Sequence, residues 1–357
     1  MRTPLFAAHV ARGARMAPFA GWDMPIQYTS ILTEHEHTRR ATSVFDICHM
    51  GEVELRGPTA LADLERLLTL PVATLAVGQC RYGYLLRDDG GVLDDLTCYR
   101  RGPDRFWLVI NASTRHQDVT WIRQHLAPAT QFLDLSATTG KVDIQGPTAR
   151  AETEHALGVR LPDLGYFRFA EITLSAVPCL LSRTGYTGEF GYELYCPLET
   201  VGLFWERLLS GGAIKPAGLG ARDTLRLEMG YALYGHELNL ERTPVGATRG
   251  HFIQFAKDFI GKAAIAKEWQ APQQLLVGLR LDSRRAARAG DAVRAAGHPV
   301  GVITSGSFAP SIGTAVALAY VDAAYAQPGQ VVDIQVRAAV LRATVARLPF
   351  YTSGTAR

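Results

Sequence analysis

The alternation of apolar and polar residues predicts antiparallel strands in the first part of the chain. RYGYLLR (81–87) and VLDDLTCYR (92–100) flank an Asp-Asp-Gly-Gly turn, which is typical of a β-hairpin, and RFWLVIN (105–111) reads as another strand. STRHQDVTWIRQHL (113–126) instead has helical spacing, with Ser113 as the expected N-cap. Neighbouring strands followed by a helix favour an α+β fold over a parallel sheet wound by helices.

One pattern of about sixteen residues occurs twice, since VELRGPTALADLERLL (53–68) resembles VDIQGPTARAETEHAL (142–157). In each copy we expect an alternating strand, a Gly-Pro turn, and an amphipathic helix that begins at Pro58 or Pro147, because proline is favoured in the first turn of a helix. The spacing is too long for a solenoid repeat. The two copies predict two related α+β units, although so short a motif can also recur by chance.

The pattern changes near Leu275. From there, alternation predicts one strand after another, from LLVGLRL (275–281) to LRATVARL (341–348), with turns such as QPGQ between some of them. The preceding stretch AAIAKEWQAPQQ (263–274) predicts a helix that runs into a linker at Pro272. The tail therefore predicts an all-β C-terminal domain, either a small barrel or a jelly roll.

Composition and charge argue against several classes of protein. The 357 residues are 47% hydrophobic and 20% charged, and the net charge of +3 shows no basic stripe of the kind that nucleic-acid binders carry. No apolar run approaches the roughly 20 residues that span a bilayer, and the N-terminus has no signal-peptide core. Five scattered cysteines without a CxxC pair support neither a zinc knuckle nor a disulfide framework. We therefore expect a cytoplasmic protein that binds neither membrane nor nucleic acid.

Two adjacent acids occupy an apolar run in GGVLDDL (90–96). Neighbouring side chains on a strand point to opposite faces, so Asp94 and Asp95 cannot share one role. We expect one carboxylate to meet water and the other to point into whatever the sheet covers, where it needs a partner or a function.

The polar segment HEHTRR (35–40) does not predict a metal site. It lacks the H-E-x-x-H spacing that puts two histidines on one helix face, because Arg39 stands where the second histidine would be. We expect a solvated helix face there, and no bound metal anywhere in the chain.

Two other polar segments favour a ligand site. SRTGYTGEFGYEL (182–194) combines tightly turning glycines with aromatic residues and Glu193. A carboxylate among aromatic rings can recognise a planar heterocycle, although a hairpin that carries these side chains without binding a ligand is equally consistent.

In ARDTLRLEMGYAL (221–233), Arg222 lies in the first turn of an expected helix, where a cation opposes the macrodipole. A nearby carboxylate or an anionic ligand would compensate that charge; a solvated arginine is the alternative.

Several stretches of the sequence share one resemblance. They are, in chain order, RTPLFAAHVARGARMAPFAGWDMPIQYTSI, FDICHMGEVELRGP, GGVLDDL, SRTGYTGEFGYEL, PAGLGARDTLRLEMGYALYGHEL, DFIGKAA and GVITSGSFAPSIGTAVALAYV. Together they cover nearly the whole chain. They resemble the glycine cleavage system T-protein family, the tetrahydrofolate-dependent aminomethyltransferases.

The resemblance implies an α+β fold of three domains around a central folate cavity. We expect residues 1–270 to hold two interleaved α+β domains, one of 1–50 with 138–270 and one of 51–137, and residues 275–357 to form a C-terminal β-barrel. The implied activity transfers a one-carbon unit from the aminomethyl-lipoyl arm of H-protein to tetrahydrofolate, releasing ammonia and leaving methylene-tetrahydrofolate. Lipoylated H-protein is the implied partner and tetrahydrofolate the implied cofactor.

The resemblance also implies roles for particular residues. Asp95 would lie beside the reacting nitrogens of folate and be catalytic by its placement rather than by an extreme pKa, with Asp94 as its structural neighbour. Glu193 would grip the pterin ring and Arg222 would bind substrate. Six further residues are expected to line or approach the cavity: Tyr82, Asn111, Tyr166, Tyr186, Tyr231 and Met50.

The sequence departs from the family in TPVGATRGHF (243–252), where Gly246 replaces an acid and His251 an aromatic residue, and at Thr114, where asparagine is common. These departures bear on the cavity wall and on substrate preference. They motivate one alternative, a folate-dependent demethylase of a small methylated compound. A second alternative, a folate-binding protein that serves iron–sulfur assembly, would carry a K-G-C-Y-x-G-Q-like motif, but DFIGKAAI contains no cysteine.

Overall fold

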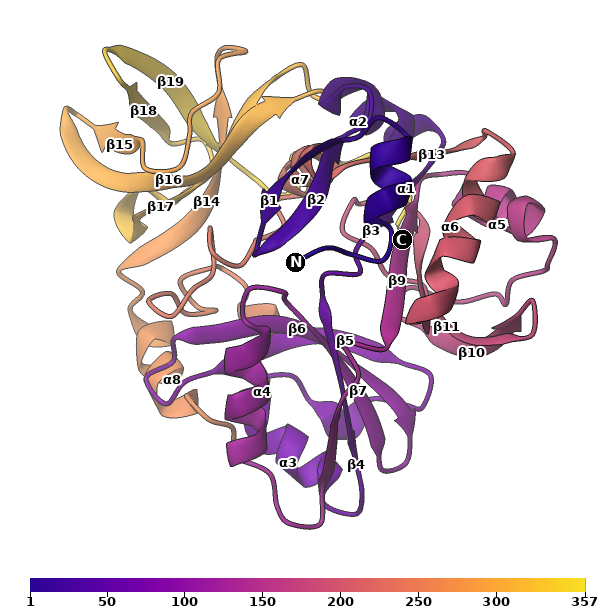
Figure 1. Cartoon of the computed structure of the whole chain (residues 1–357). Helices are drawn as coiled ribbons and strands as arrows, with labels where there is room; N and C mark the ends of the chain where they lie inside the picture. The colour runs from indigo at the N-terminus through magenta and orange to yellow at the C-terminus, as the bar shows by residue number, and fades with distance from the viewer. Residues whose placement is uncertain (357) are drawn as a thin grey trace.

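The computed structural model describes residues 1–356 of the chain (Figure 1). Within this range the strands form a two-stranded hairpin, a five-stranded sheet, a six-stranded sheet and a closed barrel. No helix in the described part of the chain is long and apolar enough to cross a membrane. Short 3-10 helices lie at Val72–Thr74, Leu198–Thr200, Gly250–Phe252 and Ala323–Tyr325.

The five-stranded sheet contains the hairpin that the sequence predicts. Strands β5 and β6 pair antiparallel around the Asp-Asp-Gly-Gly turn, and the sheet order is β5-β6-β7-β4-β8. Helices α3 and α4 pack on one face, where Leu64 and Ile122 join the buried core. The bounds are β4 Gly51–Arg56, α3 Ala60–Leu67, β5 Cys80–Leu86, β6 Val92–Gly102, β7 Arg105–Ile110, α4 Arg115–Gln124 and β8 Gln131–Asp134.

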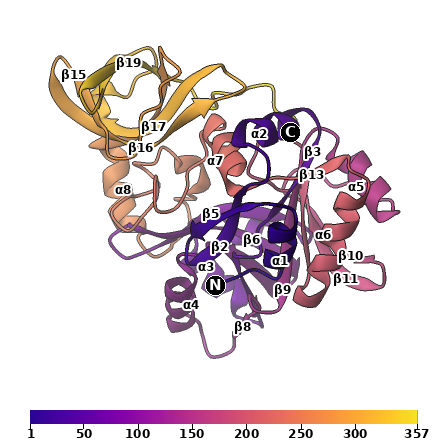
Figure 2. The same cartoon turned by 45° about the horizontal axis from the view of Figure 1, so that its top comes forward.

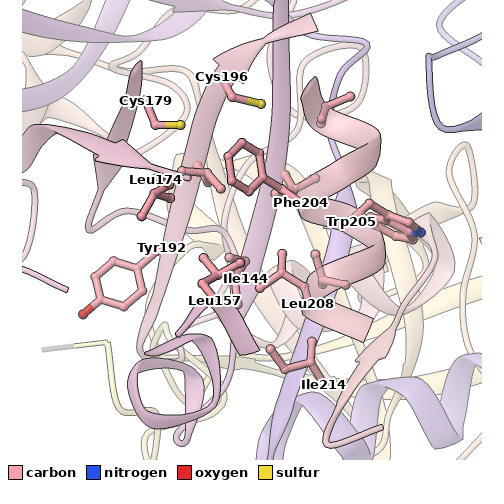
Figure 3. Close-up of a cluster of buried hydrophobic side chains, with 14 of the residues drawn as sticks. Ile144, Leu157, Leu174, Cys179, Tyr192, Cys196, Phe204, Trp205, Leu208 and Ile214 are labelled. Atoms are coloured by element: carbon pink, nitrogen blue, oxygen red, sulfur yellow. The ribbon is translucent and has the colours of Figure 1, made fainter. Parts of the chain in front are cut away.

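The six-stranded sheet has the order β10-β11-β12-β9-β3-β13, with β3 and β13 parallel and the other neighbours antiparallel. Helices α5 and α6 cover one face, and Phe204 and Trp205 of α6 pack into its core (Figure 3). The bounds are β3 Thr42–Asp46, β9 Thr139–Gln145, α5 Ala149–Leu157, β10 Phe169–Leu174, β11 Val177–Ser182, β12 Gly191–Pro197, α6 Val201–Ser210 and β13 Ile214–Pro216.

The two copies of the repeated pattern have the same local structure. Gly57 and Gly146 both adopt positive φ, and a Cβ at Gly146 would lie 1.6 Å from a backbone oxygen, so only glycine fits there. The threonines after the prolines, Thr59 and Thr148, each bond a second threonine hydroxyl at 2.7 Å. We propose that two interleaved α+β domains follow the two sheets, because β4 to β8 span residues 51–134 while β3 and β9 to β13 flank that range.

Three local predictions about these units are wrong. Strands β4 and β9 are buried on both faces instead of alternating, because helices cover one face and the opposite sheet or the cavity covers the other. Helices α3 and α5 begin two residues after Pro58 and Pro147, with a threonine at each N-cap. Helix α4 has Thr114, not Ser113, at its N-cap, because the helical backbone begins one residue later than expected.

The segment before the sheets packs against the segment after them. It consists of α1 Phe6–Ala11, β1 Arg15–Phe19, β2 Trp22–Gln27 and α2 Ile31–Arg40. Helix α7, Leu219–Glu228, contacts both β2 and α2. It begins two residues before the predicted helix 221–233 and ends five residues earlier, because the chain turns at Gly230 with a φ of 65°.

The prediction of a solvated face for residues 35–40 is also wrong. His35 is fully buried, and its Nε2 lies 3.2 Å from an oxygen of Glu228 on α7. Arg39 pairs with the same carboxylate at 2.9 Å and with Glu189 at 2.9 Å. His35 and Arg39 of α2 therefore face charged groups across a buried junction, which the sequence pattern does not distinguish from exposure to water.

The C-terminal strands close into a barrel in the order β14-β17-β16-β15-β18-β19, which settles the choice between barrel and jelly roll (Figures 1 and 2). Alanines of β17 fill its interior with small side chains, among them Ala315, Ala317 and Ala319. The bounds are α8 Lys262–Gln270 before the barrel, then β14 Gln274–Leu281, β15 Ala292–Ala295, β16 His298–Ala309, β17 Thr314–Asp322, β18 Val331–Val336 and β19 Ala339–Ala346.

Residues 351–356, after the barrel, return to the six-stranded unit. The backbone N–H of Tyr351 donates to the carbonyl of Glu228 at 3.0 Å. The hydroxyl of Thr355 donates to Glu189 Oε2 at 2.7 Å, and the N–H of Ala356 donates to the carbonyl of Gly188 at 3.1 Å. The tail thus holds the glycine-rich loop between β11 and β12.

Candidate active site

A cavity of about 390 Å³ lies between the facing sheets, with β1–β2 and the start of α7 on its sides. Its lining residues lie between Phe19 and His236, so the barrel does not line it. The barrel supports it from behind, since Ser305 accepts a hydrogen bond from Arg226 at 2.9 Å and contacts His236 at 3.1 Å. The predicted site residues that line the cavity are Asp95, Glu193, Arg222, Tyr82, Asn111, Tyr186 and Met50.

Tyr166 and Tyr231 are not among the lining residues. The ring of Tyr166 packs edge-on against Phe167, which does line the cavity, with centroids 4.7 Å apart. The ring of Tyr231 stacks behind that of Tyr186 at 5.7 Å. Both tyrosines therefore support the wall and do not form its surface.

Asp95 and Asp94 point to opposite faces of β6, as the strand geometry predicts. Asp95 faces the cavity, where Tyr82 donates to its Oδ2 at 2.8 Å and the Asn111 side chain donates to its Oδ1 at 2.9 Å. Asp94 is fully buried on the helix side, and it accepts from the backbone N–H of Asn111 at 2.9 Å and from the side chain at 2.8 Å. Asn111 thus connects the two carboxylates and fixes both.

A third acid stands behind this pair. Asp118 of α4 is fully buried and lies within hydrogen-bonding reach of Asp94. Burial and the charge of Asp94 raise the pKa of Asp118 to about 11, so Asp118 is protonated at neutral pH and can donate to Asp94. Burial first, and the Asp94 charge second, raise the pKa of Asp95 to about 7. Asp95 can therefore gain or lose a proton near neutral pH. The sequence implies that Asp95 acts by its position, and the structure gives it a raised pKa as well.

The opposite wall consists of charged residues on β9 and β12. Glu193 stands across from Asp143 in the strand register, and Tyr195 across from Lys141. Thr184 donates to Glu193 Oε2 at 2.6 Å, and Tyr195 donates to the same atom at 3.1 Å. Burial acts to raise the pKa of Glu193, but the Lys141 charge and the Thr184 hydroxyl outweigh it and hold that pKa below its usual value. Glu193 is therefore a charged acceptor at neutral pH.

Arg222 has the local carboxylate that its position at a helix start predicts. Its guanidinium pairs with Asp143 Oδ2, and it also lies over the ring of Tyr186 at 5.1 Å. Burial raises the pKa of Asp143 to about 6 against the opposing effect of Arg222. The pair keeps Arg222 in the cavity wall, where it is only partly exposed.

Lys141 and His49 are among the cavity-lining residues that escape the sequence analysis. Asp143, which pairs with Arg222 behind the cavity surface, also escapes it. Lys141 and Asp143 stand two apart in β9, on either side of Val142, and this spacing is a signal for one charged face. Burial lowers the pKa of His49 to about 4, so its ring is neutral, and its Nδ1 has no hydrogen-bond partner in the described part of the chain. Within residues 1–356, no cluster of acidic, histidine or cysteine side chains could hold a metal ion.

The departures from the family pattern lie outside the cavity surface. Gly246, His251 and Thr114 do not line it, and the Thr114 hydroxyl donates to the Asn111 carbonyl at 3.2 Å. His251 stacks on Phe252 with centroids 4.0 Å apart, and Phe252 packs against Tyr82 at 4.7 Å. Their influence on the site is therefore indirect.

Comparison with known proteins agrees with this architecture over its whole length. The glycine cleavage T-protein N-terminal domain matches residues 5–257, and the glycine cleavage T-protein C-terminal barrel domain matches residues 274–352. An aminomethyltransferase of Symbiobacterium thermophilum is 42% identical over 99% of this chain and 97% of its own length. An aminomethyltransferase of Halothermothrix orenii is 40% identical over 98% of this chain and 99% of its own length.

A solved structure gives the same result. The crystal structure of glycine cleavage system aminomethyltransferase T from Bartonella henselae superimposes with a TM-score of 0.94, at 33% identity, over 99% of both chains. These matches and the two-sheet cavity with its barrel define an enzyme of the aminomethyltransferase class. The chain belongs to the glycine cleavage T-protein family. The predictions of family, α+β fold with C-terminal barrel, and enzyme class are confirmed.

Proposed function

We propose that this enzyme transfers the one-carbon unit of an aminomethyl group, carried on the lipoyl arm of H-protein, to tetrahydrofolate and releases ammonia. Membership of the T-protein family supports this reaction. The observation that carries the assignment is Asp95, fixed by Tyr82 and Asn111 at the cavity surface opposite the charged acceptor Glu193. We further propose a cytoplasmic location.

The residues of the cavity fit a reduced pterin. Glu193 is charged, and within residues 1–356 its Oε1 has no donor closer than Lys141 Nζ at 3.8 Å. That oxygen can therefore accept N–H bonds from a heterocycle. Tyr82, Tyr186 and Phe19 supply aromatic surface, and Met50 adds a thioether to the wall. Arg222 supplies a cation for an anionic part of the substrate. Bound tetrahydrofolate supplies the nitrogens that accept the carbon.

Asp95 supplies the proton chemistry in this proposal. Forming the two carbon–nitrogen bonds of the product frees two protons from the accepting nitrogens, while the departing ammonia and the lipoyl sulfur each gain one. A carboxylate with a pKa of about 7 can accept such a proton and return it at neutral pH. Tyr82 and Asn111 aim its oxygens, and its charge stabilises cationic character at the transferred carbon.

The demethylase alternative has less support from the geometry. Its motivation was the departure at Gly246 and His251, and neither residue reaches the cavity surface. The non-enzymatic alternative is inconsistent with the enzyme class that the comparisons establish.

The direct test mixes the enzyme with aminomethylated H-protein and tetrahydrofolate and follows ammonia and methylene-tetrahydrofolate. We expect both products in equal amounts, and neither product at a comparable rate when tetrahydrofolate is omitted. Small methylated amines in place of H-protein are the control for a demethylase. Turnover of such an amine, with no turnover of H-protein, would contradict the proposal.

A further inference from the structure

Lys141 is a buried cation whose ammonium donates no hydrogen bond to an oxygen atom of residues 1–356. Its side chain is 1% exposed, yet it lines the cavity. Within residues 1–356, its Nζ donates a hydrogen bond only to Met50 Sδ, at 3.7 Å. Thioether sulfur is a weak acceptor, and an ammonium group carries three donors. Most of the hydrogen-bonding capacity of Lys141 is therefore available toward the cavity.

The carboxylate and the aromatic ring beside the Lys141 ammonium attract it but accept no hydrogen bond from it. Glu193 Oε1 lies 3.8 Å from Nζ, too far for a hydrogen bond, and the ring of Tyr195 lies 4.7 Å away. A buried charge that lacks hydrogen bonds is costly, so a retained one points to a partner that binds there.

The wall is close to electrical balance without a ligand. Lys141 and Arg222 stand against Glu193 and Asp143, while His49 is neutral because burial lowers its pKa. A ligand group that meets Lys141 therefore need not bring a full negative charge. A neutral carbonyl oxygen suffices.

Lys141 and Glu193 form a neighbouring donor and acceptor on one wall. A heterocycle in which a ring N–H stands next to a ring carbonyl presents the complementary pair in the same order. The 2-amino-4-oxopyrimidine edge of a pterin has this arrangement, because its N–H groups can meet a carboxylate while its carbonyl oxygen accepts from a cation.

We propose that Lys141 is a specificity-determining residue, whose ammonium donates to the 4-oxo oxygen of the ring that Glu193 holds by its N–H groups. This inference rests on the proposed function, because it assumes that the cavity takes a pterin. On this inference, Lys141 makes the site favour a 4-oxo ring over a 4-amino ring. The carbonyl oxygen accepts a hydrogen bond from the ammonium, whereas an amino group at the same position does not.

The test measures binding by calorimetry, without turnover. The ligands are tetrahydrofolate and its 4-amino analogue, tetrahydroaminopterin, and the variants are Lys141→Met and Lys141→Gln. The exposed Lys215 of β13 provides the matched control Lys215→Met. Melting temperatures establish that each variant is folded.

We expect the wild type to bind tetrahydrofolate more tightly than the 4-amino analogue. Lys141→Met should weaken tetrahydrofolate binding by about 10-fold to 100-fold and reduce the preference, because a charge-assisted hydrogen bond to the 4-oxo oxygen is lost. The preference that remains reflects the N3–H that the 4-amino ring cannot offer to Glu193. Lys141→Gln keeps a neutral donor and should fall between. Lys215→Met should match the wild type.

Two results would overturn the inference. Equal weakening of both ligands in a folded Lys141→Met protein would make Lys141 only a counter-ion for Glu193. Unchanged affinity for both ligands in that variant would show that the carbonyl is recognised elsewhere. Failure of the wild type to bind either ligand would instead reject the proposed folate site itself, together with this inference.

Discussion

The hydroxyl of Tyr82 donates a hydrogen bond of 2.8 Å to Oδ2 of Asp95, between neighbouring strands of the five-stranded sheet. This bond favours the charged form of the carboxylate, and so it opposes the burial that raises the pKa of Asp95. Tyr82→Phe should therefore raise that pKa above about 7. We expect slower turnover at pH 7 that recovers toward pH 9, measured as the pH profile of kcat. If the midpoint of the kcat profile does not move in Tyr82→Phe, the Tyr82 hydrogen bond does not control the pKa of Asp95.

Asp95→Asn should nearly abolish methylene-tetrahydrofolate formation and leave folate binding measurable. The amide keeps the shape of the carboxylate but cannot accept a proton, and loss of such a group costs about 10²-fold to 10⁴-fold in rate. Ammonia release is the assay, and calorimetry measures binding. Full activity in this variant would remove Asp95 from the mechanism.

Asp94→Asn tests the charge behind the Asp95 carboxylate. The Asp94 charge raises the pKa of Asp95, so its removal should lower that pKa and extend activity to lower pH. Asp118→Asn is the matched control, because Asp118 is already neutral at pH 7 and the amide reproduces that state. Its pH profile should stay near that of the wild type. An equal shift of the pH profile in Asp94→Asn and Asp118→Asn would contradict the assignment of Asp94 as charged and Asp118 as neutral.

Glu193→Ala should mainly weaken folate binding. The variant loses a carboxylate that accepts N–H bonds, a loss of roughly 1–3 kcal/mol. Thr184 and Tyr195 also lose their shared acceptor, so a melting temperature must accompany the calorimetry. Unchanged affinity for tetrahydrofolate in a folded variant would rule out the pterin role.

Glu52 gives a prediction about stability and pH. Burial raises the pKa of this carboxyl to about 8, so its neutral form is the one compatible with the fold. A raised pKa contributes stability below the unfolded value of about 4.5, and that contribution is lost as the pH rises through about 8. Glu52→Gln should melt like the wild type at pH 5 and be more stable at pH 9, by about 1 kcal/mol or more. The exposed Glu206→Gln should show no such pH-dependent gain.

Elements with local signals could be predicted from the sequence. The turn between β5 and β6 and the alternating strands of the barrel carry their periodicity in adjacent residues. Helix α2 shows the limit of this reasoning, because His35 and Arg39 look solvated in the sequence and are paired with residues more than 140 positions away. The predicted start of α4 and the predicted end of α7 also differ from the structure. The backbone turns before α4, up to Thr114, and after α7, at Gly230, and the spacing of apolar residues does not mark either turn.

The sequence predicts the site residues that lie in recognisable motifs. It does not predict the residues that join the site only through contacts in the folded protein. Asp95, Glu193 and Arg222 stand in recognisable stretches, and the structure brings them to one cavity. Lys141 escaped because it lies outside the stretches that carry the resemblance. Its alternation with Asp143 and Gln145 in β9 indicates a polar face but does not show that this face meets the cavity. The partnership of Asp118 with Asp94 was hidden too, because it joins a helix to a strand through the interior of the sheet.

Residues 351–356 secure the loop between β11 and β12 through Gly188 and Glu189, and that loop carries Tyr186 into the cavity. During synthesis on the ribosome, these residues emerge only after the barrel has been made. The enzyme therefore cannot hold this cavity-lining loop in its final position until translation has passed the whole barrel. A nascent chain that ends before the barrel would contain the residues of both sheets but would lack the segment that secures the loop between β11 and β12.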